Sequence, residues 1–309
     1  MKKRECLGID IGGTTAKYAI IGEDGSVRNE DFFPTGRKMN RQEFLQELFQ
    51  VTDRAIEEDV VGIGICSPGI LDPRSGSIVG ATENLPFLTG MNLKNFLRER
   101  YADLPVYINN DAKAAALGER WMGAARGCEN YCCITFGTGL GGAFVIDSKL
   151  VEGVHFRAGE IGYLNYRGKK DYLEKKVSTG HLMKIAATRL GIDQINGIQF
   201  FERIRKKDPI CEKILDEWVE ELGRFIANIL IMLDLEKIII GGGISNEKEI
   251  LFPRLNRKVR ELMPEQFYDE FEIVMAQCCN HAGMLGAVSV FFLNEWIGAM
   301  PVRNKSGDN

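Results

Sequence analysis

A strand, a glycine-rich turn and a second strand occur twice in this sequence, half a chain apart. Residues 9–21 can be laid on residues 134–146 at one constant shift, which places Gly12 on Gly137. Apolar and β-branched residues flank both turns, as in strand pairs joined by a tight turn. A repeat of half-chain length indicates two copies of one structural unit. We therefore expect two lobes of common architecture.

The spacing of apolar residues predicts an α/β protein. The chain has 309 residues, enough for two domains of about 150 residues each. Strand and helix patterns alternate in the first half, the stretch 174–233 is rich in helix, and an apolar helix runs from 282 to 296. Further strands are expected at 27–33, 60–66, 106–108 and 237–240, and the helices of the first half at 41–58, 93–101 and 112–122.

The composition excludes several classes of protein. The chain is 45% hydrophobic and 27% charged, and its formal net charge of -4 provides no basic field for nucleic acid. The first residues, MKKRECLGID, run into a strand without the apolar stretch of a signal peptide, and no window reaches about 18 apolar residues in a row. We expect a cytoplasmic protein without nucleic-acid or membrane partners.

The cysteines also favour a cytoplasmic protein. None of the eight forms a C-x-x-C pair, and several lie within apolar runs. This pattern is typical of reduced thiols packed in the core, and it argues against disulfides or a metal cluster. The eight are Cys6, Cys66, Cys128, Cys132, Cys133, Cys211, Cys278 and Cys279.

The first glycine turn has the composition of a phosphate-binding loop. Gly12 and Gly13 lack the Cβ atoms that would keep the backbone away from a phosphate, so their amides can point at its oxygens. Thr14 and Thr15 add hydroxyl donors, and Asp10 can hold the Mg²⁺ that accompanies ATP. A tight hairpin with a surface acid is the alternative.

The second glycine turn matches a dinucleotide motif in letters only. Gly137, Thr138 and Gly139 begin a G-x-G-x-x-G run. That motif needs a helix directly after the glycines, because the helix N-terminus receives the pyrophosphate. Residues 143–147 predict a strand instead, so we reject a dehydrogenase and expect a second hairpin that contacts phosphates.

A third glycine cluster follows the strand 237–240. Gly241, Gly242 and Gly243 would let a flat adenine and ribose lie against the backbone. A plain turn between strand and helix is the alternative for this cluster taken alone. Three glycine turns, each after a strand, together favour a nucleotide-binding cleft.

Asn110 and Asp111 stand where a strand passes into a helix. Phosphoryl transfer needs positioned phosphates and one group that accepts the proton of the nucleophile. A carboxylate at a strand end can be that base, so Asp111 is a candidate. The alternative is a helix N-cap, a position that Asp favours.

Six segments of the chain together resemble the ROK (repressor, ORF, kinase) family of sugar kinases. The resemblance covers nearly the whole chain and implies the two-lobed actin-like or hexokinase fold, with duplicated ribonuclease H-like lobes and with ATP and sugar bound between them. It also implies that Asp111 is the catalytic base. The segments, in family order, are LGIDIGGTTAKYAII, GIGICSPGI, INNDAKAAALGE, ITFGTGLGG, AGEIG and IIIGGGIS.

The resemblance also implies a set of sugar-binding residues. The family positions that contact sugar fall on Asn84, Asn110, Asp111 and Glu160, with Glu174 as a further acid. Carboxylates suit this part because each can accept hydrogen bonds from two adjacent sugar hydroxyls. Without the resemblance, solvated surface charge would be the expected reading of both glutamates.

Two departures from the family pattern bear on metal and sugar. The histidine usual three residues after Glu160 is Tyr163, which can donate a hydrogen bond to a sugar or stack on its ring. The usual Cys-x-Cys-Gly-x-x-Gly-Cys segment is replaced by residues 165–172, which contain no cysteine. Because a tetrahedral zinc site needs four N or S ligands, we expect no structural zinc.

The sequence therefore predicts an ATP-dependent sugar kinase that phosphorylates a hexose or hexosyl hydroxyl, at O6, with β-glucosides, N-acetylmannosamine and glucose as candidates. One expected lobe is 1–112 with 282–300, for sugar and phosphates, and the other is 113–281, for nucleotide and dimerisation. Relatives indicate a homodimer. A sugar-sensing transcriptional regulator is one alternative, although only six residues precede Leu7, too few for a DNA-binding domain. A nucleotide-binding scaffold without catalysis is the other.

Overall fold

The chain divides into two compact units. The computed structural model describes residues 3–137, 139–165, 168, 170–267 and 271–293. Unit 1 is formed by the chain up to Ala114 and from Met284 onward, and unit 2 by Ala115–Gly283. Each unit contains a mixed sheet with helices packed on it, which confirms the predicted α/β class.

Unit 1 is built on a five-stranded sheet in the order β3-β2-β1-β4-β7. The first three strands form an antiparallel meander, and β1, β4 and β7 run parallel to one another. The carboxyl ends of β1, β4 and β7 therefore meet at one edge of the sheet. The strands are β1 Glu5–Ile11, β2 Thr15–Gly22, β3 Val27–Pro34, β4 Ile63–Ser67 and β7 Val106–Asn110.

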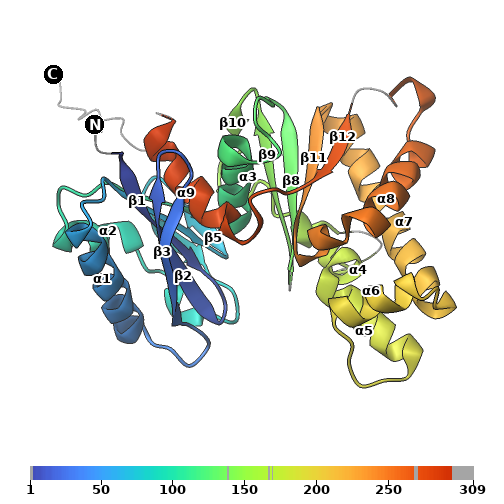
Figure 1. Ribbon diagram of the computed structural model, residues 1–309, viewed down its shortest axis with the longest axis horizontal. Coiled ribbons are helices and arrows are strands. Elements are labelled where there is room, and N and C mark those ends of the chain that lie inside the picture. The colour runs from blue at the N-terminus through green and yellow to red at the C-terminus, as the bar shows by residue number, and fades with distance from the viewer. Residues whose placement is uncertain (1–2, 138, 166–167, 169, 268–270, 294–309) are drawn as a thin grey trace. The chain divides into compact units, whose positions relative to one another are not determined.

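Helices cover both faces of this sheet (Figure 1). Helices α1 (Arg41–Glu57) and α2 (Leu93–Arg100) pack on one face, where apolar side chains such as Phe44 and Leu97 meet strand residues in one core. A capping box begins α1, because the Asn40 side chain accepts from the Glu43 amide and the Glu43 carboxylate accepts from the Asn40 amide, both at 3.0 Å. The smaller elements of unit 1 are β5 Ile70–Asp72, β6 Ser77–Gly80 and the 3₁₀ turn η1 Pro86–Leu88.

Helix α9 (Ala282–Phe292) packs closely on the other face of the sheet. It is the apolar final helix that the sequence predicts. Gly8 and Gly64 are register partners on β1 and β4. A Cβ atom on Gly64 would lie 2.5 Å from the backbone carbonyl group of Ala287, and one on Gly8 would lie 3.2 Å from Cβ of Met284. The two glycines therefore form a trough that lets the backbone of α9 lie against the strands. The predicted residues 294–300 lie outside the described part of the chain.

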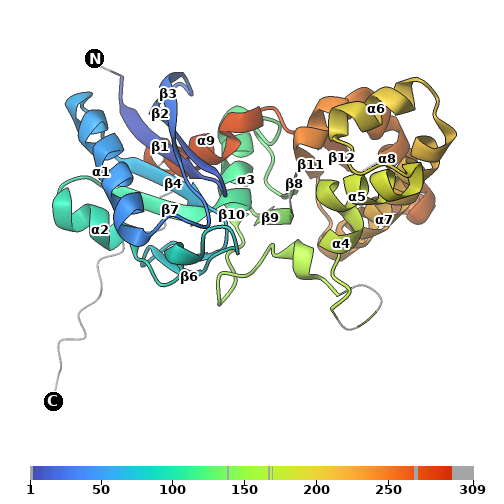
Figure 2. The same cartoon turned by 90° about the horizontal axis from the view of Figure 1, so that it is seen from below.

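Unit 2 repeats the architecture of unit 1 (Figure 2). Its sheet has the order β10-β9-β8-β11-β12, again with an antiparallel meander followed by parallel strands. Helix α3 (Asp111–Met122) begins in unit 1, and its later part packs on β8, where the Tyr131 hydroxyl donates to the Ala116 carbonyl at 2.9 Å. The strands are β8 Tyr131–Phe136, β9 Leu140–Ile146, β10 Lys149–Leu150, β11 Lys237–Gly242 and β12 Glu272–Met275.

A helical layer covers the other face of the second sheet. The longest helix, α7, carries a wide apolar face that includes Trp218, whose indole donates to the Val177 carbonyl at 2.9 Å. The predicted helix-rich stretch is thus confirmed. The helices are α4 Glu174–Val177, α5 Thr179–Leu190, α6 Gly197–Arg205, α7 Pro209–Leu233 and α8 Lys248–Leu262, with the 3₁₀ turns η2 Ile161–Tyr163, η3 Gly243–Glu247, η4 Glu265–Phe267 and η5 Cys279–His281.

The matching sheets confirm the predicted internal repeat, but the constant shift used to align it is wrong in the second strand. Ile11 pairs with Ala16 in the first hairpin, whereas Phe136 pairs with Leu140 in the second. The second turn is therefore one residue shorter. A constant shift aligns the first strands of the two hairpins but misaligns the strands that follow by one residue, which would exchange their two faces.

Two smaller expectations are also corrected. Seven cysteines are buried, but Cys279, the first residue of η5, is exposed. The strand expected at 60–66 begins at Ile63, because the chain turns at residues 58–59 and bends again at Val61. Among the described residues, no helix is both long and apolar enough to cross a membrane.

Candidate functional site

Three polar residues lie side by side at the carboxyl ends of the parallel strands of unit 1. Asp10 on β1 is the register partner of Cys66 on β4, and Cys66 is the partner of Asn109 on β7. The register is fixed by buried strand residues on either side, so these side chains are held by the sheet itself. In open α/β sheets, ligands bind at this edge.

Asp111 directly follows β7 and begins α3. Its side chain is exposed to solvent, yet the surrounding protein still displaces part of the water that would solvate its carboxyl group. Burial, and then the carboxylate of Asp10, raise the pKa of Asp111 to about 6. Burial likewise raises the pKa of Asp10. The structure thus brings two of the predicted site acids close enough to influence each other.

Asn110, not Asp111, provides most of the cap of α3. Its Oδ1 accepts from the amides of Ala112 at 3.0 Å and Lys113 at 3.2 Å, and its Nδ2 donates to the Gly69 carbonyl at 3.0 Å. Oδ1 of Asp111 accepts from the amide of Ala112 at 2.8 Å, one of the two amides that Oδ1 of Asn110 also caps. Asn110 therefore has a clear structural role as the cap of α3, and its contact with sugar stays a prediction.

The first glycine turn leaves amides available for a ligand. Its carbonyls are engaged within the protein: Thr15 accepts from the Gly12 amide at 2.9 Å, and Gly12 accepts from the Thr35 hydroxyl at 2.7 Å. Within the described ranges, the amides of Gly13 and Thr14 have no hydrogen-bond partner. The exposed side chain of Asn84 lies beside Gly13, where a Cβ would meet it at 3.4 Å.

The second glycine turn is the end of a strand pair, which confirms the rejection of a dinucleotide motif. Gly137 donates to the Gly139 carbonyl at 3.1 Å, and β9 follows where a dehydrogenase would have a helix. A Cβ on Gly139 would lie 2.9 Å from Oε2 of Glu174. Glu174 is therefore next to this turn. Thr138 lies outside the described residues.

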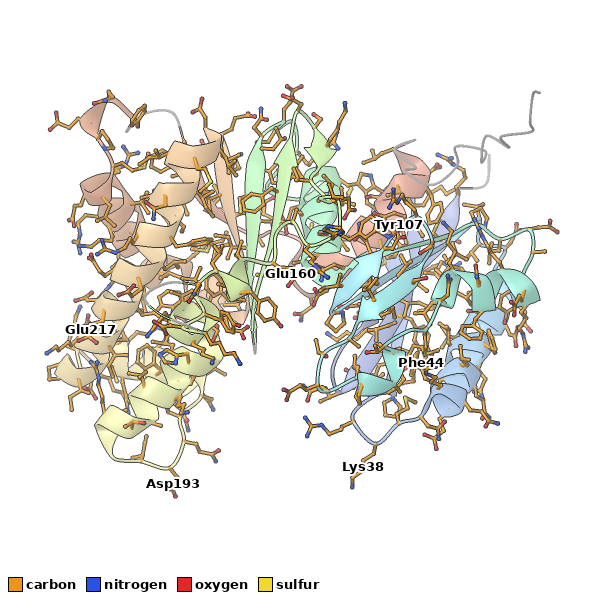
Figure 3. The ribbon with its side chains drawn as sticks, turned by 180° about the vertical axis from the view of Figure 1, so that it is seen from behind. Lys38, Phe44, Tyr107, Glu160, Asp193 and Glu217 are labelled. Atoms are coloured by element: carbon orange, nitrogen blue, oxygen red, sulfur yellow. The ribbon has the colours of Figure 1, made fainter. Side chains whose placement is uncertain are left out.

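Glu160 and Tyr163 border η2 in unit 2. Glu160, labelled in Figure 3, is half-buried and immediately precedes η2, and Tyr163 ends it with 63% of its surface exposed. A Cβ on Gly162, within η2, would lie 3.4 Å from Cβ and Oε2 of Glu174. The predicted acids Glu160 and Glu174 thus lie on segments that contact each other.

In the third glycine cluster, the backbone structure requires a glycine at one position. Gly242 has φ of +88°, and a Cβ there would lie 1.9 Å from the carbonyl oxygen of Phe136. Gly241 is still part of β11, paired with Thr135, whereas a Cβ on Gly243 would meet nothing within 4 Å. Only Gly243 therefore has open space beside it, and contact with adenine stays a prediction.

Two buried residues that make polar contacts are absent from the predicted site. Cys66, expected only to fill the core, donates a hydrogen bond from its thiol to Oδ1 of Asp10 at 3.3 Å. Glu119 is fully buried in unit 2, and its carboxylate accepts from the amides of Ala124, Gln277 and Cys278 at 2.8 to 3.0 Å. For Cys66, the strand end opposite Asp10 was a usable signal. For Glu119, none of the local patterns indicates its distant partners.

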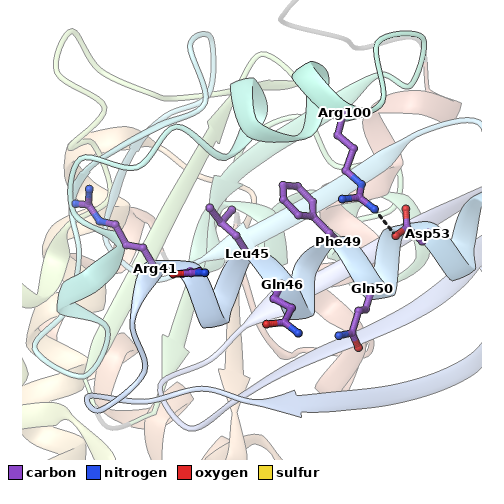
Figure 4. A pocket seen from close by; sticks show the side chains of 8 residues that line it. Arg41, Leu45, Gln46, Phe49, Gln50, Asp53 and Arg100 are labelled. Carbon is purple, nitrogen blue, oxygen red and sulfur yellow. Dashed lines mark hydrogen bonds and ion pairs between the residues drawn. The ribbon is translucent and has the colours of Figure 1, made fainter.

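A surface groove of about 600 Å³ along α1 contains none of the predicted residues (Figure 4). Its polar groups are already engaged within the protein. Asp53 accepts from Arg100 at 2.7 Å and from the Tyr101 hydroxyl at 2.6 Å, and Arg41 donates to the carbonyls of Phe87 and Thr89. The Arg100 guanidinium also lies 4.9 Å from the centre of the Phe49 ring. We therefore place the candidate site at the strand ends and not here. No group of three or more His, Cys, Asp or Glu suited to a metal is found in the residues the structure covers.

The duplicated sheet and the acids at its strand ends define a protein of the actin-like fold. A family model described as the ROK family matches residues 6–292, and the chain belongs to this family. A glucokinase of Thermotoga maritima is 30% identical over 326 residues, covering 96% of this chain and 100% of that protein. A β-glucoside kinase of Listeria innocua is 30% identical over 299 residues, covering 93% and 97%.

A solved structure gives the same fold. The ROK family glucokinase from Streptomyces griseus, in complex with glucose and AMPPNP, matches with a TM-score of 0.80 and 27% identity. The match covers 93% of this chain and 98% of that one. The predicted actin-like fold and ROK membership are thereby confirmed.

Proposed function

We propose that this chain transfers the γ-phosphoryl group of ATP to a hydroxyl of a hexose or hexosyl group, at O6, with Asp111 as the base. The observation that carries the proposal is the position of Asp111 beside Asp10, at the carboxyl end of parallel strands, with a pKa raised to about 6. The named activities of the glucokinase and β-glucoside kinase relatives support it.

The raised pKa suits a general base. A carboxylate with an ordinary pKa near 4 is a weak proton acceptor, whereas a pKa near 6 keeps Asp111 ionised at neutral pH and makes it a stronger one. As O6 of the sugar attacks the γ-phosphorus, its proton passes to the carboxylate of Asp111, and the bond from phosphorus to the β,γ-bridging oxygen breaks. ADP and the sugar phosphate are the products.

The phosphates would be bound by backbone. The free amides of Gly13 and Thr14 can donate to phosphate oxygens, with the hydroxyls of Thr14 and Thr15 beside them. Asp10 fits a Mg²⁺ that comes with ATP, since a half-buried carboxylate with a raised pKa gains from a nearby cation and one carboxylate plus phosphates is a usual Mg²⁺ ligand set. When bound, Mg²⁺ neutralises the charge of the phosphates.

The sugar would be held by acids and an amide. Glu160 and Glu174, on contacting segments, can each accept hydrogen bonds from adjacent hydroxyls, and Asn84 adds an amide beside the first glycine turn. β-Glucosides, glucose and N-acetylmannosamine remain the candidate substrates. ADP release should be measured over a panel of these sugars with the purified chain. Release that depends on one sugar, with a phosphorylated product, is expected; no release with any hexose or glycoside would reject the proposal.

A further inference from the structure

Two tyrosines near the sugar-binding acids form an edge-to-face pair in unit 2. The ring centres of Tyr163 and Tyr172 lie 5.6 Å apart with the ring planes at 78°. This is the geometry that aromatic pairs prefer, because the positive edge of one ring meets the negative face of the other. The ammonium of Lys175 lies 5.5 Å from the centre of the Tyr172 ring and adds a cation–π contact.

The backbone around the two rings is also joined. Asn165 and Tyr172 form an antiparallel bridge, and the Leu173 amide donates to the Leu164 carbonyl at 2.8 Å. Two residues beside the rings, Ile161 and Leu173, are buried in the core of unit 2. The residues that carry the two rings, 163–165 and 172–173, are therefore joined to each other, and their neighbours Ile161 and Leu173 are anchored in the core.

The two acids proposed to bind sugar lie at the ends of this segment. Glu160 precedes η2, which Tyr163 ends, and Glu174 follows Tyr172 by two residues. Gly162 and Glu174 are close neighbours, since a Cβ added to the glycine would lie 3.4 Å from Cβ and Oε2 of Glu174. The rings thus join the two stretches of chain that carry Glu160 and Glu174.

We infer that Tyr163 and Tyr172 form an aromatic clasp that sets the spacing of Glu160 and Glu174, which makes both tyrosines positioning residues for sugar binding. Two carboxylates can accept hydrogen bonds from hydroxyls of one sugar ring only at the right spacing. The affinity for sugar therefore falls when that spacing changes. The stabilisation from an aromatic pair of this geometry corresponds to a factor of about two to twelve in an equilibrium constant. The effect should therefore fall on sugar affinity and leave ATP affinity unchanged.

The inference rests on the proposed function, and a double-mutant cycle tests it. Tyr163→Leu and Tyr172→Leu should each raise the KM for sugar about two- to twelvefold with the KM for ATP unchanged, and the double variant should be no worse than either single one. Tyr172→Phe keeps its ring and should behave like wild type. Phe267→Leu, which removes another exposed ring of unit 2, is the matched control.

Three outcomes would overturn the inference. Additive effects in the double variant would show that the rings act separately. A normal Tyr172→Leu would show that Tyr163 acts alone, and a Tyr172→Phe as defective as Tyr172→Leu would assign the effect to the Tyr172 hydroxyl and not to its ring. Circular dichroism checks folding, and a methionine variant replaces any leucine variant that does not fold. If wild type phosphorylates no sugar, the proposed function fails instead, and the same cycle measured on thermal unfolding still tests the clasp.

Discussion

The thiol of Cys66 donates a hydrogen bond to Oδ1 of Asp10, across 3.3 Å at the carboxyl ends of two adjacent parallel strands. Cys66 is fully buried, and burial together with the carboxylates of Asp10 and Asp111 raises its pKa well above the ordinary value. The thiol thus stays protonated and keeps donating. This hydrogen bond restricts the orientation of the Asp10 carboxylate.

Cys66 variants should separate its hydrogen bond from its packing. Cys66→Ala removes the donor and should raise the KM for MgATP about two- to tenfold, since a weak donor to a charged acceptor contributes about 0.5–1.5 kcal/mol. Cys66→Ser keeps a donor of similar size and should stay near wild type. Steady-state kinetics with varied MgATP measures both. Equal defects in the two variants would show that packing, not donation, is what matters.

Asp111→Asn should remove the base while preserving binding. The amide cannot accept the proton of the sugar hydroxyl, so kcat should fall about 10²- to 10⁴-fold with sugar affinity nearly unchanged. Asp103→Asn, at an exposed acid on the loop before β7, is the control and should be normal. Calorimetric sugar binding and initial rates provide the two readouts. A variant that retains near wild-type turnover would remove Asp111 from the proposed mechanism.

The rate of sugar phosphorylation should fall in acid. Because the pKa of Asp111 in the free protein is raised to about 6, the carboxylate is protonated as the pH drops through that value, and kcat/KM for sugar should then decline about tenfold per pH unit. A profile of kcat/KM from about pH 4.5 to 8 checks this. A flat profile over that range would mean that the ionisation of Asp111 does not control the rate.

The stability of the folded protein should also depend on the ionisation of Asp111. Activity needs the ionised carboxylate, whereas stability is greater when the carboxyl group is protonated. The folded pKa of about 6 exceeds the ordinary value of 3.8, so the folded state binds the proton more tightly and stability decreases as the pH rises from 4 to 6. Asp111→Asn should therefore raise the melting temperature at pH 8, with a gain that shrinks toward pH 4. Calorimetric scans at both values test this. An equal shift at the two pH values would indicate an effect other than charge.

Gly64→Ala should destabilise unit 1 strongly. The added Cβ would lie 2.5 Å from the backbone of Ala287, and backbone cannot move aside as a flexible side chain can. Overpacking of this kind costs about 1–3 kcal/mol, which corresponds to a fall of several degrees in melting temperature. Gly80→Ala is the control, since a Cβ there meets nothing within 4 Å. Equal melting temperatures for the two variants would contradict the close packing of α9.

Local patterns predicted the elements and the duplicated sheets, because strand alternation, glycine turns and the half-chain repeat are all visible in neighbouring residues. The one-residue difference between the two hairpins was not predictable, since Ala16 and Leu140 both fit an apolar strand and only the hydrogen bonds decide the register. Asp111 could be placed at a strand end, but its pKa depends on Asp10, which is distant in sequence. The Tyr163–Tyr172 contact likewise joins residues nine positions apart that no local pattern pairs.

The position of α9 has a consequence for synthesis of the protein. Unit 1 receives this helix only after the whole of Ala115–Gly283 has been made, although the strands it covers are among the first to leave the ribosome. On a nascent chain, the trough at Gly8 and Gly64 therefore stays uncovered until α9 is made. Unit 2 is a single continuous stretch of sequence, so it can fold before then. A chaperone that shields apolar sheet surface would act during this interval, and chains released before residue 284 would be the ones that aggregate.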